Sequence, residues 1–187
     1  MFAYKQFRQN WFQPRSAFNG HMYMKTLGLL LALTLLLNAG CSEDEQPNWS
    51  IDKAKINELL NLSTEQISIE GTTLELHAYL WRDFMPISPP DGKDLISINW
   101  LVDVDSVAIP SNILLSEQYV INGDSLWTTS YTNELRETQP YLVERISRDG
   151  PKWGPNIEVT VIAKVVNAST KLEYFLIREN QQILRTD

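Results

Sequence analysis

Hydrophobic and polar residues alternate along most of the chain after Ile67, with the two-residue period of half-buried β-strands. Three segments show the alternation most clearly. Their apolar faces are Leu74, Leu76, Ala78 and Leu80; then Ile96, Ile98, Trp100, Val102 and Val104; then Ile157, Val159, Val161, Ala163 and Val165. We expect the third set to point into a core, because its other face carries charged and hydroxyl side chains.

Shorter β-like runs cover residues 112–121, 125–132 and 141–148. The first two flank the sequence NGDS, in which Asn122 and Gly123 suit the positive φ angles of a tight hairpin turn. The sequence NAST at 167–170 is a second turn signal, and it predicts a hairpin over residues 157–178. Together the runs predict seven or eight strands.

A single helix is predicted before the strands. Residues 50–63 place apolar side chains at partly helical spacing, and either Ser50 or Asp52 can cap the helix. One helix followed by many short strands predicts an all-β fold, an antiparallel β-sandwich that is immunoglobulin-like in its broad architecture. A small β-barrel is the alternative.

The longest hydrophobic run lies outside this pattern, at Leu27–Leu37, where eleven residues carry no charge. A membrane-spanning helix needs roughly 20 apolar residues, so the run is too short to cross a bilayer. A basic start, an apolar middle and the small residues of NAGC at 38–41 are typical of a secretory signal peptide.

Residues 1–23 fit no part of such a signal, whereas Met24 and Lys25 open one directly. We therefore interpret residues 1–40 as a signal peptide with an over-extended gene start and Met24 as its true first residue. The alternative is a genuine, unusually long basic region.

The junction Leu37-Asn38-Ala39-Gly40-Cys41 resembles the lipobox of bacterial lipoproteins. The family usually has leucine three residues before the cysteine, where this chain has Asn38. The resemblance implies that Cys41 is acylated, becomes the mature N-terminus and holds the protein on a membrane. It also implies that residues 41–50 form a lipidated tether. The length of the remaining chain, residues 51–187, predicts a single domain.

An acidic cluster follows directly: Ser42, Glu43, Asp44 and Glu45. A short polar, acidic tract is typical of a solvated tether. A serine and several acids after a lipidated cysteine also resemble the surface-export tag of Bacteroidota lipoproteins. That resemblance predicts an outer-membrane lipoprotein at the cell surface, with a periplasm-facing one as the alternative.

Charge narrows the function classes. All 23 acidic residues but only 12 of the 16 basic residues follow Gly40, which gives the mature chain a formal charge of −11. Nucleic-acid binding requires basic surfaces, so no nucleic-acid partner is expected. Cys41 is the only cysteine, so no disulfide is available and the domain must be held by packing and strand pairing.

Catalytic signals are few. His77 is the only histidine after the signal peptide and lies on the outward face of its strand, so no Ser–His or Cys–His pairing is predicted. No nucleotide or cofactor motif and no zinc spacing occurs. We predict a protein that is not an enzyme and has no cofactor or metal. The alternatives are a small glycan-active hydrolase using Asp83, Asp91 or Asp94, and calcium at Asp103, Asp105 or the NGDS turn.

Two proline-rich loops remain to be explained: WRDFMPISPPDGKD at 81–94 and RDGPKWGP at 148–155. Rigid loops with aromatic and basic residues have the composition of binding hot spots. The candidate binding residues are Trp81, Arg82, Asp83, Phe84, Met85, Lys152 and Trp153, with protein or glycan as the ligand. In the alternative interpretation the large side chains close the ends of the sandwich, and Arg82 and Asp83 make local salt bridges.

Overall fold

In a computed structural model of the chain, the structure describes residues 48–131 and 139–187. The signal peptide, Cys41 and the acidic cluster lie outside these residues. Where the chain is described, it has one helix, α2 (Lys53–Leu62), and ten strands. The strands are β1 (Ser50–Ile51), β2 (Ser63–Thr64), β3 (Gln66–Ile69), β4 (Thr72–Asp83), β5 (Leu95–Asp103), β6 (Ile113–Asn122), β7 (Ser125–Ser130), β8 (Leu142–Gly150), β9 (Glu158–Asn167) and β10 (Glu173–Thr186).

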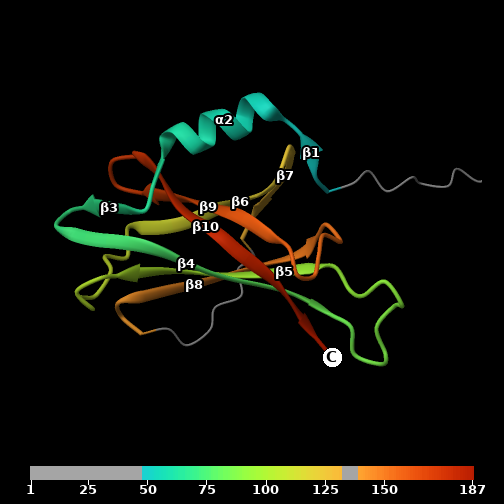
Figure 1. The fold of residues 1–187 in the computed structure, drawn as a ribbon. Helices are drawn as coiled ribbons and strands as arrows, with labels where there is room; N and C mark the ends of the chain where they lie inside the picture. The colour runs from blue at the N-terminus through green and yellow to red at the C-terminus, as the bar shows by residue number, and fades with distance from the viewer. Residues whose placement is uncertain (1–47, 132–138) are drawn as a thin grey trace, which may run out of the picture. The chain divides into compact units, whose positions relative to one another are not determined.

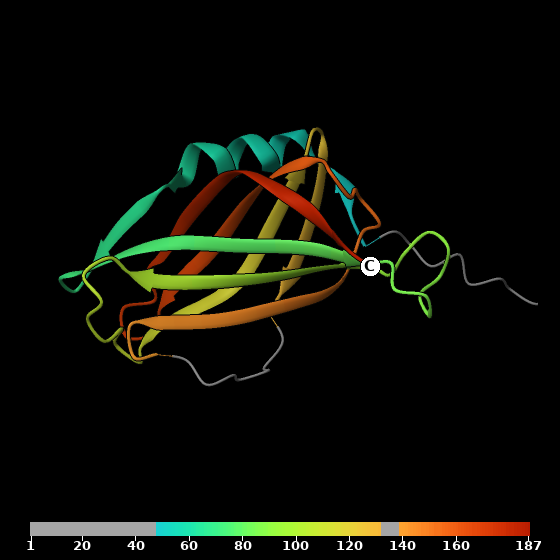
Figure 2. The same ribbon diagram turned by 60° about the horizontal axis from the view of Figure 1, so that its bottom comes forward.

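Eight strands form one curled sheet in the order β1-β7-β6-β9-β10-β4-β5-β8, with β2 beside β10 and β3 beside β4 (Figure 1). The sheet is mixed, because β10 runs parallel to β4 and β2 whereas the other pairs are antiparallel. The strands bend around a shared interior like half of a barrel (Figure 2). The prediction of a mostly β fold with one short helix is confirmed, and the path is a single curled sheet.

Strand β10 joins the two halves of this sheet. Its first part pairs with β9, and its last part, Ile183–Thr186, pairs with β4 at Leu80–Asp83. The register shifts between Arg178 and Gln181, where Asn180 has a φ of 55°. An irregularity of this kind bends a strand and increases its twist, so β10 can leave one partner and meet the other.

The local predictions are largely confirmed. Asp52 caps α2, with its Oδ1 accepting a hydrogen bond from the Lys55 amide at 2.9 Å. The hairpin over 157–178 is formed by β9 and the first part of β10. The β6–β7 hairpin turns at Gly123, whose φ is 58°, whereas Asn122 lies at the strand end without a positive φ.

Two hydrophobic clusters stabilise the sheet. The interior cluster includes Leu76, Leu101 and Val161, all at most 1% exposed. A second cluster lies on the outer face, where Ile56 and Leu59 of α2 cover Ile162 of β9 and its neighbours. Buried apolar area of this kind provides the main driving force for folding. Within residues 48–131 and 139–187, no helix combines the length and hydrophobicity needed to cross a bilayer.

Strand β5 differs from expectation. Ile96, Ile98, Trp100 and Val102 do share a face, but the interior is lined by the opposite face. That face carries Leu95, Ser97, Asn99, Leu101 and Asp103, each at most 2% exposed. A strand that places polar side chains inward reverses the apparent alternation, because the more apolar face is the outer one.

Candidate functional site

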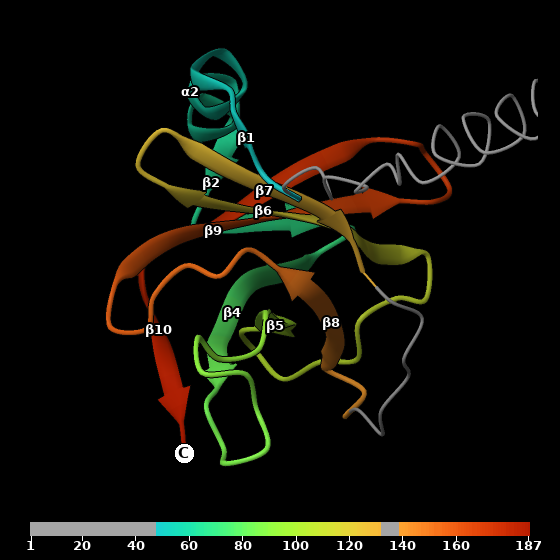
Figure 3. The same cartoon turned by 90° about the vertical axis from the view of Figure 1, so that its right-hand side faces the viewer.

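The two proline-rich loops lie at one end of the described domain, where β4 leads into β5 and β8 leads into β9. Figure 3 views this end, with both loops toward the reader. Lys152 Nζ reaches the Asp91 carboxylate across the two loops at 2.7 Å. The fold therefore brings together two segments that lie about sixty residues apart in the sequence.

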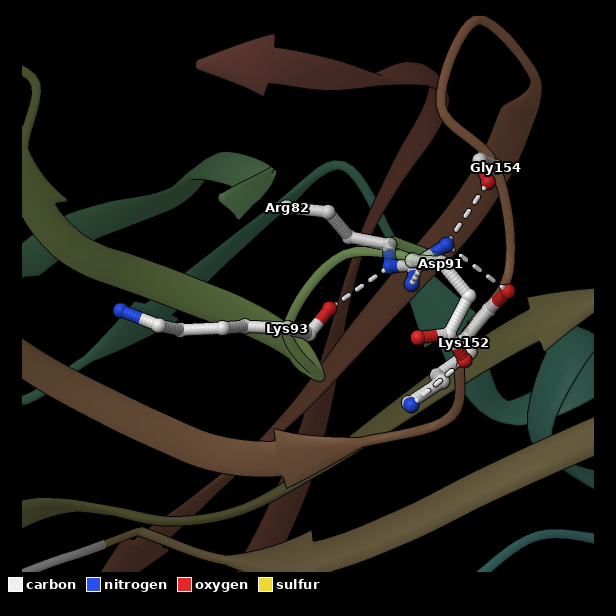
Figure 4. A network of polar contacts seen from close by, with 5 residues as sticks. All are labelled: Arg82, Asp91, Lys93, Lys152 and Gly154. Carbon is white, nitrogen blue, oxygen red and sulfur yellow. Dashed lines mark hydrogen bonds and ion pairs between the residues drawn. The ribbon is translucent and has the colours of Figure 1, made fainter. Parts of the chain in front are cut away.

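Arg82 connects these loops. Its side chain is 3% exposed and occupies the inward register of β4, two residues after Leu80. Nε donates to the Lys93 carbonyl at 2.8 Å, and Nη1 donates to the carbonyls of Lys152 and Gly154 at 3.1 and 2.9 Å. Nη2 donates to the Asp91 carbonyl. The guanidinium lies between the two loops (Figure 4) and fixes four backbone positions.

The buried guanidinium of Arg82 keeps its positive charge. Burial lowers the pKa of its guanidinium, while the charges of Asp91 and Asp94 oppose that change. Arginine is protonated at any physiological pH, and its planar fork can serve several acceptors at once. In the alternative interpretation Arg82 and Asp83 make local salt bridges. Asp83 does pair with Lys93, at 2.9 Å, whereas the hydrogen bonds of Arg82 go to backbone carbonyls.

The first loop is built from two turns. The Ser88 amide donates to the Met85 carbonyl at 2.7 Å, and the Gly92 amide donates to the Pro89 carbonyl at 2.8 Å. A Cβ at Gly92 would lie 2.6 Å from the Phe84 ring, so only glycine allows this approach. The loop base closes where the Lys93 amide donates to the Asp83 carbonyl at 2.8 Å.

The seven candidate binding residues fall into different environments. Phe84 lies beneath two guanidinium groups, with Arg82 Cζ at 5.1 Å and Arg185 Cζ at 4.0 Å from its centroid. Trp153 packs on the interior cluster and contacts Trp49 with centroids 6.1 Å apart. Phe84 and Trp153 therefore act mainly in packing, as the alternative interpretation expected.

The other candidates differ in exposure. Trp81 is partly buried on the outer face of β4, with its ring tilted against that of Tyr79 at 5.4 Å between centroids. Met85 is 47% exposed, and the Lys152 side chain is 44% exposed. Asp83 is held in place by Lys93 Nζ at 2.9 Å and by the Met85 amide.

A hollow of about 290 Å³ opens between the loops. Its lining is Pro89, Gly92, Lys93, Asp94, Ile96, Arg148, Asp149 and Lys152. Charges of both signs surround a partly apolar floor at Ile96. Lys93, Ile96 and Arg148 line the hollow but were not among the predicted binding residues. No local motif identifies them, because the hollow exists only where the two loops meet.

Two of the carboxylates considered for hydrolysis, Asp83 and Asp91, have lowered pKa values. Hydrogen bonding to Lys93 lowers the pKa of Asp83, and hydrogen bonding to Lys152 lowers that of Asp91. A general acid of a glycosidase needs a raised pKa. Asp94 is exposed at the edge of the hollow.

Asp103 and His77, also considered for chemistry, make local contacts. Asp103 is buried, and its Oδ1 accepts from the amides of Asp105 and Val107 at 3.1 and 2.8 Å, so it caps the β5–β6 loop. His77 is exposed beside Glu75, with Nε2 and Oε1 2.7 Å apart. Among residues 48–131 and 139–187, no three His, Cys, Asp or Glu side chains are grouped to hold a metal.

A separate polar cluster lies inside the curled sheet. Asn99 Nδ2 donates to Gln118 Oε1 at 2.6 Å, and both side chains are fully buried. Ser147 Oγ is buried with no hydrogen-bond partner among the described residues. Burial raises the pKa of the Tyr131 phenol well above its ordinary value, while the charge of Arg145 and the side chain of Asn99 beside the hydroxyl oppose that change.

Comparison with protein-family models, with curated proteins and with solved structures gives no match for this chain. The site must therefore be interpreted from its own geometry.

Proposed function

We propose that the protein is a lipid-anchored envelope or cell-surface binding module that recognises a protein or glycan partner with its two proline-rich loops. Cys41 supplies the anchor, and the described domain supplies the binding surface. The proposal does not depend on whether the curled sheet is classed with immunoglobulin-like sandwiches, which stays a prediction.

The observation that carries the proposal is the position of Arg82. One buried guanidinium holds carbonyls from both loops, at Asp91, Lys93, Lys152 and Gly154. Loops that are ordered before binding lose less conformational entropy when a partner arrives, which increases affinity. Burying the Arg82 cation costs desolvation free energy. A binding surface that must be ordered before its partner arrives explains why two surface loops are fixed at that cost.

The chemistry of the hollow suits a polar partner. Its lining combines Lys93, Arg148 and Lys152 with Asp94 and Asp149. A lining with both signs of charge fixes the orientation of a partner, while the apolar side chain of Ile96 contributes area. The lowered pKa values of Asp83 and Asp91 do not suit either carboxylate to the general-acid role in the alternative of carboxylate-based hydrolysis.

The test is photocrosslinking in cells that produce the full chain. A photoreactive amino acid is placed at position 94, in the hollow, or at position 172, which is exposed in the β9–β10 turn. We expect a discrete adduct from position 94 and none from position 172. Equal adducts from both positions, or none from position 94, would contradict the proposal.

A matched pair of variants adds specificity. Lys152→Ala removes the 2.7 Å ion pair to Asp91 but leaves the carbonyl that Arg82 holds. Lys53→Ala removes a comparable exposed pair, 2.6 Å from Asp124, away from the loops. The adduct from position 94 should weaken in the first variant and persist in the second.

A further inference from the structure

An uncharged, exposed loop tip lies at the same end of the domain as the hollow. Residues 84–90, FMPISPP, contain no charge in a chain that is otherwise strongly charged. Ile87 is 88% exposed and Met85 is 47% exposed, and Pro86, Pro89 and Pro90 beside them are exposed as well. The turn between Met85 and Ser88 presents this tip as an ordered element.

The polypeptide enters the domain at this end. Asn48 Nδ2 donates to the Asp149 carbonyl, and the Trp49 ring contacts that of Trp153. Both partners belong to the second proline-rich loop, which Arg82 and Lys152 join to the first. Figures 1 and 3 show β1 and both loops at the same end.

The length of chain between Cys41 and Asn48 limits how far this end can lie from a membrane. Seven residues, fully extended, span at most about 25 Å. With Cys41 acylated in the bilayer, Asn48 and the Asp149 carbonyl that it binds must lie within that distance of the lipid surface, and the two loops lie at the same end of the domain. The opposite end, with Val107 and Leu172, has no such constraint.

We propose that the tip at residues 84–90 contacts the bilayer and orients the domain with its two-loop end toward the lipid. This inference rests on the acylation of Cys41 that the proposed function includes. Ile87, Met85 and the prolines enter the interfacial region, where apolar side chains gain from leaving water. The hollow is then held at the membrane surface, and its partner is one that is presented there.

The net charge of the mature chain predicts which kind of lipid surface the tip contacts. The mature chain carries a formal charge of −11, so an anionic surface repels it and offers no attraction. The contact at the tip is apolar, which predicts binding to zwitterionic phosphatidylcholine that does not improve when anionic lipid is added. Lys93 and Lys152 near the tip are already paired with Asp83 and Asp91.

The experiment places a fluorophore at the tip of the acylated protein. Ile87→Cys and, as the control, Leu172→Cys are labelled after reconstitution into phosphatidylcholine vesicles that contain nitroxide-labelled lipid. We expect loss of most of the fluorescence at position 87 and little loss at position 172. The Leu172 side chain is 56% exposed, so both positions are open to labelling.

Three outcomes separate the inference from the proposed function. Quenching at position 87 alone supports the tip contact, and replacing Met85 by serine should then reduce it. Protein that stays on the vesicles with equal, weak quenching at both positions keeps the anchor and overturns the tip contact. Protein that leaves the vesicles overturns the anchor itself, and this inference with it.

Discussion

Replacing Arg82 by methionine tests whether one side chain orders the two-loop end. Methionine keeps much of the apolar stem but cannot donate to the four carbonyls. Each hydrogen bond from a charged group contributes about 1.5–3 kcal/mol. The carbonyls belong to residues at the surface, where water can replace the lost donor, so we count about half of the sum. The expected loss in unfolding free energy is about 3–6 kcal/mol.

The assays are thermal unfolding and hydrogen exchange. Unfolding entropy of about 2.1 cal/mol/K per residue converts this loss to a drop in Tm of about 10–20 °C for a domain of this size. Amides in residues 84–94 and 151–156 should exchange faster, while those of β6 and β9 keep their relative protection. Arg82→Lys should resemble Arg82→Met, because an ammonium group cannot reach all four acceptors.

Arg185→Met is the matched control. Its guanidinium lies over the same Phe84 ring, at 4.0 Å, but it is exposed and pairs with Asp187. Exposed pairs contribute about 0–1 kcal/mol, so this variant should keep nearly the full stability. If Arg82→Met loses less than about 1 kcal/mol and leaves loop exchange unchanged, the reasoning from buried hydrogen bonds to loop order is wrong.

Three further predictions concern other parts of the chain. Tyr131→Phe removes the buried hydroxyl beside Asn99, so denaturant unfolding should show a stability within about 1 kcal/mol of the parent protein; a larger loss would show that this hydroxyl makes a strong hydrogen bond. Hydrogen bonds to Lys93 and Lys152 hold the pKa values of Asp83 and Asp91 below 3.8. The stabilisation of the loops by these two ion pairs should therefore be complete above pH 3.8 and fall as the pH drops through the lowered pKa values, which hydrogen exchange of the loop amides can follow. Faster loop exchange that begins above about pH 5 would contradict this prediction. Cys41→Ala should release the protein from the membrane fraction, and a variant that still partitions fully with membranes would refute the anchor.

The sequence predicts the regular parts of the fold because local rules govern them. Asp52 caps its helix, and the alternation at Leu74, Leu76 and Leu80 places those side chains inside. The parallel pairing of β10 with β4 could not be predicted, because it joins segments about a hundred residues apart and no local pattern encodes it. For the same reason, the strand order of the single curled sheet could not be predicted.

The inward face of β5 could not be predicted from hydrophobicity. Ser97 and Asn99 are fully buried, and the polar pairing of Asn99 with Gln118 on β6 makes that burial tolerable. Arg82, in contrast, left a signal: it continues the apolar face of Leu74, Leu76 and Leu80 at the next inward position. A charge at the end of an inward-facing row indicates a buried network, although its partners become visible only in three dimensions.

The order in which the strands occur along the chain has a consequence for folding during synthesis. The strand that joins the two halves of the sheet, β10, follows all the other described strands in sequence. The strands of one half (β1, β6, β7 and β9) and those of the other (β3, β4, β5 and β8) are therefore all made before the strand that links them. Pairing of the two halves must wait for Ile183–Thr186 to reach β4. Until then each half exposes apolar surface that the finished domain buries.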